Sequence, residues 1–252
     1  MATRRARCQQ LIRRYYADVP TREMVLDDIV LGLLRSEHVL LDAGCGSTLA
    51  LLNQYAPKVA FAVGLDVITA YERPRGRGAV AVGDLARTPF LDGAFDVIVS
   101  RSVVEHLERP VDVFAEVART LKPGGYLVFT TPNKYYYSSL VAWSIPYNWK
   151  DRFMRWVFGD ESYDHFPVRY RANSRRALRR VAAAAGLEIV RLQALRHFPF
   201  YFVFSPVLFR LGMIYDWVVT RLRLDGLQST WVVVMRKPGG FATDHSDRRC
   251  VS

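Results

Sequence analysis

Short apolar runs alternate along this chain with segments in which apolar residues recur every three or four positions. The runs have the length and the Val, Ile and Ala content of buried strands, whereas the intervening segments have the period of amphipathic helices. The predicted strands are 39–42, 60–66, 79–82, 95–100 and 126–130. Strands that alternate with helices in this order form a parallel sheet with helices on both faces. The pattern therefore predicts an α/β fold whose ligands bind at the carboxyl ends of the strands.

The segments outside this alternation set the expected domain organisation. Residues 1–36 have helical spacing and predict an N-terminal helical lead-in to a domain that spans 37–237. Within that domain, 133–170 is an insertion rich in aromatic residues and 195–227 is a hydrophobic insertion. The polar segment 238–252 is expected to be a disordered tail.

Composition and charge narrow the class of protein. Half of the 252 residues are hydrophobic, which is enough for one large domain with insertions. The net charge is +11, but the 30 arginines and 5 lysines are spread along the chain, which favours a basic surface in water over a dedicated polyanion site. Three distant cysteines and an N-terminus without an apolar signal core indicate neither disulfides nor export. A cytoplasmic protein is therefore expected.

The stretch 39–48 organises the rest of the chain, because it joins the first strand to a helix through two glycines. It follows the pattern D-x-G-x-G from Asp42, and the third glycine of a dinucleotide motif is absent. Gly44 and Gly46 allow backbone N–H groups to approach a ligand closely. The Ser47-Thr48 pair is expected to cap the helix, whose N-terminus favours a carboxylate.

Two further acids follow the next strands. Asp66 lies 24 residues after Asp42 (66 − 42 = 24), as one β-α-β unit requires. An acid at this position accepts hydrogen bonds from ribose hydroxyls in nucleotide-binding folds. Asp84 follows the third strand at the same edge of the sheet, where it is suited to accept from an exocyclic amine such as that of adenine.

The order and spacing of these motifs resemble those of class I S-adenosylmethionine-dependent methyltransferases of the broad small-molecule group, types 11 and 23. The matching segments are 41–46, 64–66, 83–85, 95–98, 104–107, 121–125 and 131–133. The resemblance implies a Rossmann-like, doubly wound, mostly parallel sheet of seven strands. It also implies two later strands, 187–192 and 229–235, the first of which follows a helix over 175–185.

The resemblance further implies S-adenosylmethionine as cofactor and S-adenosylhomocysteine as product. Nothing in the sequence requires a metal, and none is expected. It places the methionine end of the cofactor at the glycine turn, the ribose at the second strand, the adenine at the third and the methyl donor near the fourth. The implied cofactor residues are Asp42, Ala43, Gly44, Cys45, Gly46, Asp66, Val67, Asp84, Leu85, Ser100 and Arg101. Arg101 departs from the small or apolar residue expected there, which leaves open a contact with the cofactor carboxylate or with an acidic substrate.

The aromatic insertion is the expected source of the acceptor site, since 12 of the residues from 135 to 170 are aromatic. Such rings suit either a cover over a ring-shaped or acyl substrate or a small aromatic core. Methyl transfer to a hydroxyl requires a base, and histidine is suited to that role near neutral pH. His165 is the first candidate and His106 the second. The candidate acceptor-binding residues are Tyr135, Tyr136, Tyr163, Arg169 and Tyr170.

We expect methyl transfer to an oxygen of a small-molecule or lipid-linked acceptor, such as a glycolipid. N- or C-methylation, a nucleic-acid methyltransferase and a non-catalytic cofactor-binding subunit are the alternatives. The stretch 198–219 is too polar to cross a membrane and too apolar for a plain loop. It is compatible with peripheral contact at the inner membrane surface, with a homodimer interface and with a cover over the chain's own pocket.

Overall fold

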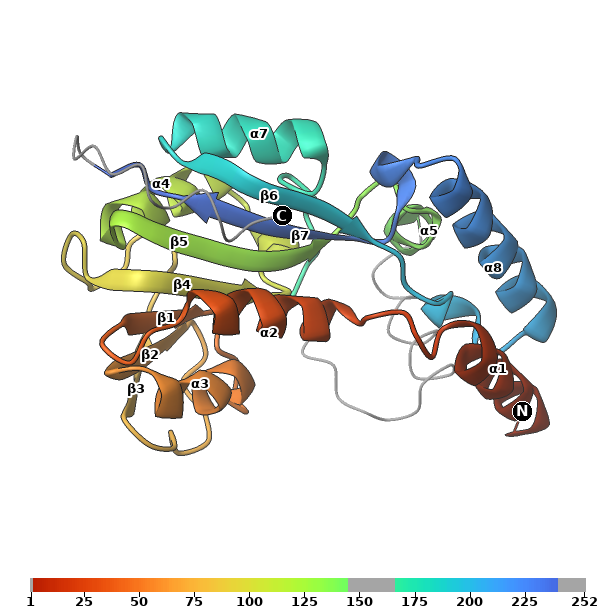
Figure 1. The fold of residues 1–252 in the computed structure, drawn as a ribbon, viewed down its shortest axis with the longest axis horizontal. Helices are drawn as coiled ribbons and strands as arrows, with labels where there is room; N and C mark the ends of the chain where they lie inside the picture. Colours follow the sequence, from red (N-terminus) through yellow and green to blue (C-terminus); the bar gives the residue numbers. More distant parts are fainter. Residues whose placement is uncertain (1, 145–165, 240–252) are drawn as a thin grey trace.

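The computed structural model describes residues 2–144 and 166–239. Its centre is a seven-stranded sheet in the order β3-β2-β1-β4-β5-β7-β6 (Figure 1). The strands are β1 (Val39–Ala43), β2 (Phe61–Asp66), β3 (Gly78–Val82), β4 (Phe95–Arg101), β5 (Leu121–Pro132), β6 (Glu188–Leu195) and β7 (Thr230–Arg236). Only β7 runs antiparallel to its neighbours β5 and β6. The predicted fold class, a doubly wound and mostly parallel sheet, is confirmed.

Helices cover both faces of the sheet, because successive side chains of each strand point to opposite sides. Leu40 packs in the core beneath α2 (Arg22–Leu33) and α3 (Ala50–Tyr55). Its neighbour Leu41 packs in the opposite core, beneath α4 and α7. These two helices are α4 (Pro110–Thr120) and α7 (Arg175–Ala184). The short helical turns are η1 (Ala56–Lys58), η2 (Val104–His106), η3 (Phe200–Phe202) and η4 (Asp225–Leu227).

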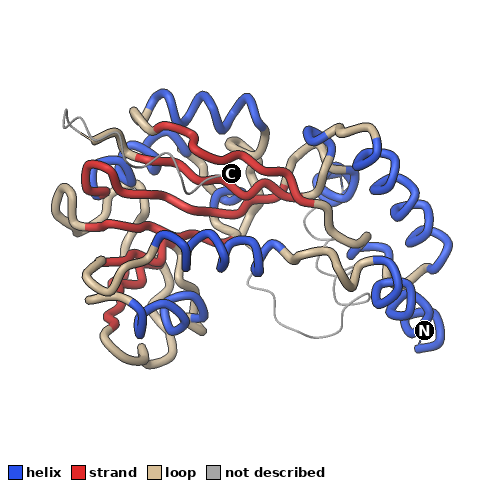
Figure 2. Tube along the Cα trace, in the orientation of Figure 1, coloured by secondary structure: helices blue, strands red, loops and turns tan. Residues whose placement is uncertain are grey.

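Three further helices form a group beyond the carboxyl ends of β5 and β6, away from the two layers that cover the sheet (Figures 1 and 2). They are α1 (Ala2–Tyr15), α5 (Tyr137–Ser144) and α8 (Pro206–Arg221). α1 and the chain around α8 share a small core of their own, in which Cys8, Val203 and Phe209 are buried. In the described ranges, 2–144 and 166–239, no helix is long and apolar enough to cross a membrane.

α8 occupies nearly half of the hydrophobic insertion, and the sequence around its start explains where it begins. Ser205 accepts a hydrogen bond from the backbone N–H of Leu208, and Pro206 takes the first helical position, where its missing N–H costs nothing. The predicted domain boundaries remain a prediction. Residues 145–165 of the aromatic insertion and nearly all of the expected C-terminal tail lie outside the described residues.

One local prediction at the glycine turn is wrong. Neither Ser47 nor Thr48 caps α3, which begins at Ala50 after Leu49 in a left-handed conformation (φ 52°) without a side-chain cap. Instead, the Asp42 carboxylate accepts the N–H of Leu52 at 2.9 Å from the end of the preceding strand. The acid of the motif therefore satisfies a free N–H in the first turn of the helix.

Candidate functional site

The glycine turn after β1 leaves its backbone open to a ligand. Gly44 and Gly46 have positive φ values of 82° and 63°. Residues that carry a Cβ adopt this backbone conformation only at a cost in free energy. A Cβ on Gly44 would overlap Cγ2 of Val103, whereas a Cβ on Gly46 would meet no atom within 4 Å. The turn is held in place by the N–H of Gly44, which donates to the carbonyl of Leu65 at 2.7 Å. Close packing on one side and open space on the other are what a ligand cradle requires.

Asp42 lies at the bottom of this cradle and is buried. Burial raises the pKa of its carboxyl from 3.8 to about 7, although the N–H of Leu52 and the charge of Arg101 oppose that shift. Its second oxygen, Oδ1, is buried without a hydrogen-bond partner in the described part of the chain. A buried unpaired oxygen costs stability unless a ligand or water satisfies it.

The other backbone and side-chain groups of the turn are fixed by neighbouring strands. Cys45 is buried against Gly64, and burial raises the pKa of its thiol to about 12, so that it contributes its backbone to the site and not a nucleophile. The hydroxyl of Ser100 donates to the carbonyl of Ala43 at 2.7 Å and joins the ends of β4 and β1. Arg101 is half-buried at the end of β4.

Asp66 is positioned by two backbone groups. Its Oδ2 accepts the N–H of Gly46 at 2.8 Å, and its Oδ1 accepts the N–H of Ile68 at 3.3 Å. These bonds tie the second strand directly to the glycine turn and fix the orientation of the carboxylate. Its remaining lone pairs are available to the two vicinal hydroxyls of a ribose. Val67, next in the chain, is 56% exposed and offers an apolar surface beside them.

Asp84 and Leu85, after β3, are the third part of the site, beside the glycine turn and Asp66. The Asp84 side chain is exposed and accepts the N–H of Ala86 at 2.8 Å, which closes a tight turn. Leu85 is half-buried and, with Ala43 and Val103, lines an apolar cavity of about 20 Å³ beneath the glycine turn. The sequence analysis missed Val103 as part of the site, because no sequence signal shows which side chain fills the space beside a glycine.

The residues present therefore fit the cofactor that the resemblance implies. The open cradle at Gly44 and Gly46 accepts a small amino-acid moiety against backbone N–H groups, and Asp66 is a fixed bidentate acceptor at the adjoining strand. Ser102, just after β4, has a positive φ of 59°, which is uncommon for serine. Strained backbone conformations of this kind cluster at functional sites.

A second pocket, of about 360 Å³, lies at the carboxyl ends of β5 and β6. Its lining includes Tyr136, Tyr170, Phe198, Phe200 and Arg22. Hydroxyl-bearing residues complete the wall: Ser138, Ser139, Ser229 and Thr230. The mixture of aromatic surface with a few polar groups is typical of small-molecule sites.

The predicted acceptor residues do not all meet in this pocket. Tyr136 and Tyr170 line it, whereas Tyr135 lines a different pocket with Arg175 and Trp231. Arg169 forms an ion pair with Glu108 at 2.6 Å on the surface. Tyr163 and His165 lie outside the described residues.

His106 is half-buried just after β4, and its environment defines its tautomer. Its Nδ1 lies 3.2 Å from the carbonyl oxygen of Pro167, and its ring packs edge-on against Phe166. Because a carbonyl only accepts, Nδ1 carries the hydrogen in the neutral ring, which leaves a lone pair on Nε2. An imidazole in this tautomer is able to accept a proton.

Glu105, the residue before His106, was not predicted as a functional residue. Its carboxyl is buried, and burial raises its pKa, opposed by a backbone hydrogen bond and by the nearby charge of Arg22. Its Oε2 accepts a hydrogen bond from Thr131 Oγ1 at 3.2 Å, and its backbone carbonyl accepts from Arg169 and Tyr170. Glu105 thereby holds the segment that carries Tyr170 against the end of β5.

Asp216 on α8 is a second buried acid that sequence reasoning missed. It accepts hydrogen bonds from the hydroxyls of Tyr16 at 3.1 Å and Tyr136 at 3.2 Å. Burial raises the pKa of its carboxyl to about 7. A lone acid within an apolar stretch was the sequence signal for a buried partner. These contacts join α8 to the residue that follows α1 and to the wall of the 360 Å³ pocket.

The raised pKa of Asp216 predicts a pH-dependent stability. The native state holds this proton more tightly than the unfolded chain, so its contribution is fully present below about pH 4 and is lost as the pH rises through about 7. Asp216→Asn should reduce the fall in unfolding free energy between about pH 4 and pH 8 by up to about 4 kcal/mol. Urea denaturation at several pH values measures it. An unchanged fall, or an equal reduction in the exposed control Asp112→Asn, would contradict the assignment.

In the described ranges, no group of three or more His, Cys, Asp or Glu side chains is arranged to hold a metal ion.

Comparisons with known proteins agree with this geometry. A family model described as a methyltransferase domain matches residues 4–192. A probable S-adenosylmethionine-dependent methyltransferase of Mycolicibacterium smegmatis is 35% identical over 105 residues, which are 39% of this chain and 40% of that protein. A malonyl-acyl-carrier-protein O-methyltransferase of a Marinomonas species is 32% identical over 125 residues, 46% of each chain. This chain spans less than half the length of these two relatives.

Among solved structures, the geranyl diphosphate C-methyltransferase of Streptomyces coelicolor, in complex with Mg²⁺, geranyl-S-thiolodiphosphate and S-adenosylhomocysteine, has a TM-score of 0.57. The two are 18% identical, and the match covers 86% of this chain and 76% of that one. At this level of identity the likeness shows the fold.

Proposed function

Because this chain belongs to the class I S-adenosylmethionine-dependent methyltransferases, we propose that it methylates an oxygen atom of a small-molecule or lipid-linked acceptor. The cofactor supplies an electrophilic methyl group on its sulfonium. The protein's part is to bind the cofactor, to hold the acceptor oxygen in line with that methyl group and to remove the acceptor's proton.

In this proposal the glycine turn, Asp66 and Asp84 each bind a different part of the cofactor. The turn at Gly44 and Gly46 receives the methionine end, Asp66 binds the ribose hydroxyls, and the Asp84-Leu85 turn contacts the adenine. Ser100 holds β4 against β1, so that the end of β4 faces the methyl donor. Arg101, whose charge lowers the pKa of Asp42, would then attract a methionine carboxylate or an acidic acceptor.

The 360 Å³ pocket is the observation that carries the proposal of a small-molecule acceptor. It lies at the end of the sheet where ligands bind in this fold, and its volume suits a small molecule. Among the described residues that line it, Arg22 alone has a permanent charge, so the pocket favours an uncharged ring or an acidic group over a cationic amine. α8, which carries exposed apolar side chains beside this region, favours a lipid-linked acceptor.

The test is a methyl-transfer screen with the purified protein and tritiated S-adenosylmethionine. Phenols, acyl carboxylates, glycolipids, amines and RNA are offered separately, and the product of any active class is analysed by NMR to identify the methylated atom. We expect label on an oxygen of a hydroxyl or carboxyl acceptor. Label found only on nitrogen, carbon or RNA would contradict the proposal.

We further propose His106 as the base, since Nε2 of the tautomer held by Pro167 is free to accept a proton. His106→Gln should lower kcat for a hydroxyl acceptor by about 10²- to 10⁴-fold, the usual contribution of a general base. The affinity for S-adenosylmethionine should stay at its wild-type value. Steady-state kinetics and calorimetric titration measure the two quantities.

Two parallel variants make this test specific. His38→Gln alters a histidine before β1, at the opposite end of the sheet, and should leave kcat unchanged. His165→Gln tests the first candidate of the sequence analysis. A loss of kcat in His165→Gln with full activity in His106→Gln would transfer the role to His165.

A further inference from the structure

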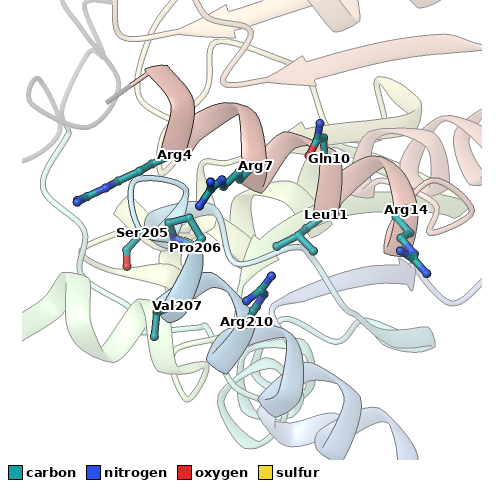
Figure 3. Close-up of a pocket in the computed structure, with 9 residues that line it drawn as sticks. All are labelled: Arg4, Arg7, Gln10, Leu11, Arg14, Ser205, Pro206, Val207 and Arg210. Atoms are coloured by element: carbon teal, nitrogen blue, oxygen red, sulfur yellow. The ribbon is translucent and has the colours of Figure 1, made fainter.

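α1 and α8 enclose a groove lined by arginines, outside the cofactor and acceptor sites. The groove has a volume of about 710 Å³, and its lining includes Arg4, Arg7 and Arg14 from α1 and Arg210 from α8. Figure 3 shows Arg7 and Arg210 extending into the space between the two helices. None of the described residues that line the groove is acidic.

These guanidinium groups lack anionic partners within the described part of the chain. Arg4, Arg7 and Arg210 form no ion pair or hydrogen bond there, and Arg14 lies over the ring of Tyr15 at 5.4 Å. α1 carries five arginines and no acid, and the one acid of α8, Asp216, is buried and bound to tyrosines. The groove is therefore a concentrated positive field that an oxyanion would neutralise.

An apolar face of α8 adjoins this charge. Val207, Leu211, Ile214 and Trp217 recur every three or four residues and lie on one side of the helix. Each is more than half exposed, from 57% for Leu211 and Ile214 to 67% for Val207. A run of large apolar side chains exposed on one helix face marks a binding surface.

A second groove, of about 450 Å³, connects the arginines with the apolar face. Leu11 and Arg210 line both grooves, and the second one adds Tyr15, Ile214 and Trp217. Tyrosine and tryptophan are enriched where proteins meet the boundary between lipid headgroups and acyl chains. The surface thus places cationic, aromatic and aliphatic groups side by side.

We propose that the α1–α8 surface, defined by these two grooves and the exposed face of α8, docks the protein on an anionic lipid bilayer. The arginines bind lipid phosphates, while Leu211, Ile214 and Trp217 enter the headgroup region. A second copy of the chain fits this surface poorly, because a two-fold interface would bring two arginine-rich patches together. The surface lies beyond the carboxyl ends of β5 and β6, where the acceptor pocket lies (Figure 1).

The inference adds a lipid surface to the proposed function and is measured without methyl transfer, so either can fail alone. The full chain is sedimented with vesicles of phosphatidylcholine, with or without about one third phosphatidylglycerol. Binding to the anionic vesicles alone is expected, and it should weaken at high salt. Arg7→Gln/Arg210→Gln should weaken it about 25-fold, at roughly fivefold per arginine, and Trp217→Ser about tenfold.

Arg176→Gln/Arg179→Gln is the matched control, since it removes the same charge from exposed positions on α7. It should bind vesicles as the wild type does, and calorimetric titration should show wild-type affinity for S-adenosylmethionine in all variants. Absent binding, equal binding to both vesicle types or an equal loss in the α7 control would overturn the proposal. So would a dimer that Trp217→Ser dissociates, or binding of inorganic phosphate through Arg7 and Arg210 without vesicle binding.

Discussion

Replacing Gly44 by alanine is expected to lower the affinity of the protein for S-adenosylmethionine by about 100-fold. The new methyl group would overlap Cγ2 of Val103, and the residue would have to keep a φ of 82°. Left-handed backbone and overpacking each cost roughly 1–3 kcal/mol, so the turn is expected to leave the geometry that presents its N–H groups. Calorimetric titration measures the loss, and thermal denaturation establishes that the variant is folded.

A second substitution separates the overlap from the backbone strain. Gly44→Ala/Val103→Ala removes the atom that the new methyl group meets, so it should recover about tenfold of the lost affinity. Gly186→Ala is the matched control, because Gly186 has a similar φ of 67° and no atom within 4 Å of an added Cβ, and it follows α7 far from the turn. The control should lose about 1 kcal/mol of stability and no affinity for the cofactor. Wild-type affinity for the cofactor in Gly44→Ala would contradict the claim that the glycine turn binds it.

Asp66→Ala is expected to weaken cofactor binding by 100-fold or more, about 3 kcal/mol. The substitution removes the acceptor for two ribose hydroxyls and the bonds that Asp66 receives from the N–H groups of Gly46 and Ile68. The glycine turn and the ribose site are thus lost together. Titration should show the same fold-loss of affinity for S-adenosylmethionine and for S-adenosylhomocysteine, because both molecules contain the ribose.

Asp84→Ala provides the comparison for this prediction. The Asp84 side chain is exposed and accepts a hydrogen bond from the N–H of Ala86 within its own turn. Its removal should therefore lower the affinity for the cofactor by about tenfold. Asp66→Asn keeps one acceptor oxygen, so its loss of cofactor affinity should lie between the losses of the two alanine variants. If Asp84→Ala weakened binding more than Asp66→Ala does, the division of ribose and adenine between these acids would be wrong.

The sheet was predictable because each strand has a local signal. Buried parallel strands are apolar on both faces, as in the run from Val39 to Leu41. The first three strands also end beside an acid or a glycine that marks their carboxyl edge. The spacing of Asp42 and Asp66 gave the β-α-β unit between them. The cap of α3 was not predictable from the Ser47-Thr48 pair, because Leu49 takes a left-handed conformation and Asp42, ten residues before Leu52 and in another element, supplies the acceptor.

Two buried acids that were not predicted as functional residues show where local patterns fail. Elements distant in the sequence bury both carboxyls, and this burial raises the pKa values of Glu105 and Asp216. The hydrogen bonds that Asp216 accepts from Tyr16 and Tyr136 oppose the shift. The start of α8 did carry a readable signal, since Ser205-Pro206 is a cap followed by a first-turn proline. The packing of α8 against α1 was not predictable, because apolar periodicity does not show which two helices contact each other.

Calorimetric titration of the wild-type protein with S-adenosylhomocysteine, repeated on Gly44→Ala and Asp66→Ala, tests the central claim most directly. The account predicts one ligand per chain with micromolar affinity, about −8 kcal/mol, and a loss of about 100-fold or more in both variants. No binding to the folded wild type, or binding that neither substitution weakens, would contradict a cofactor site built on the turn after β1.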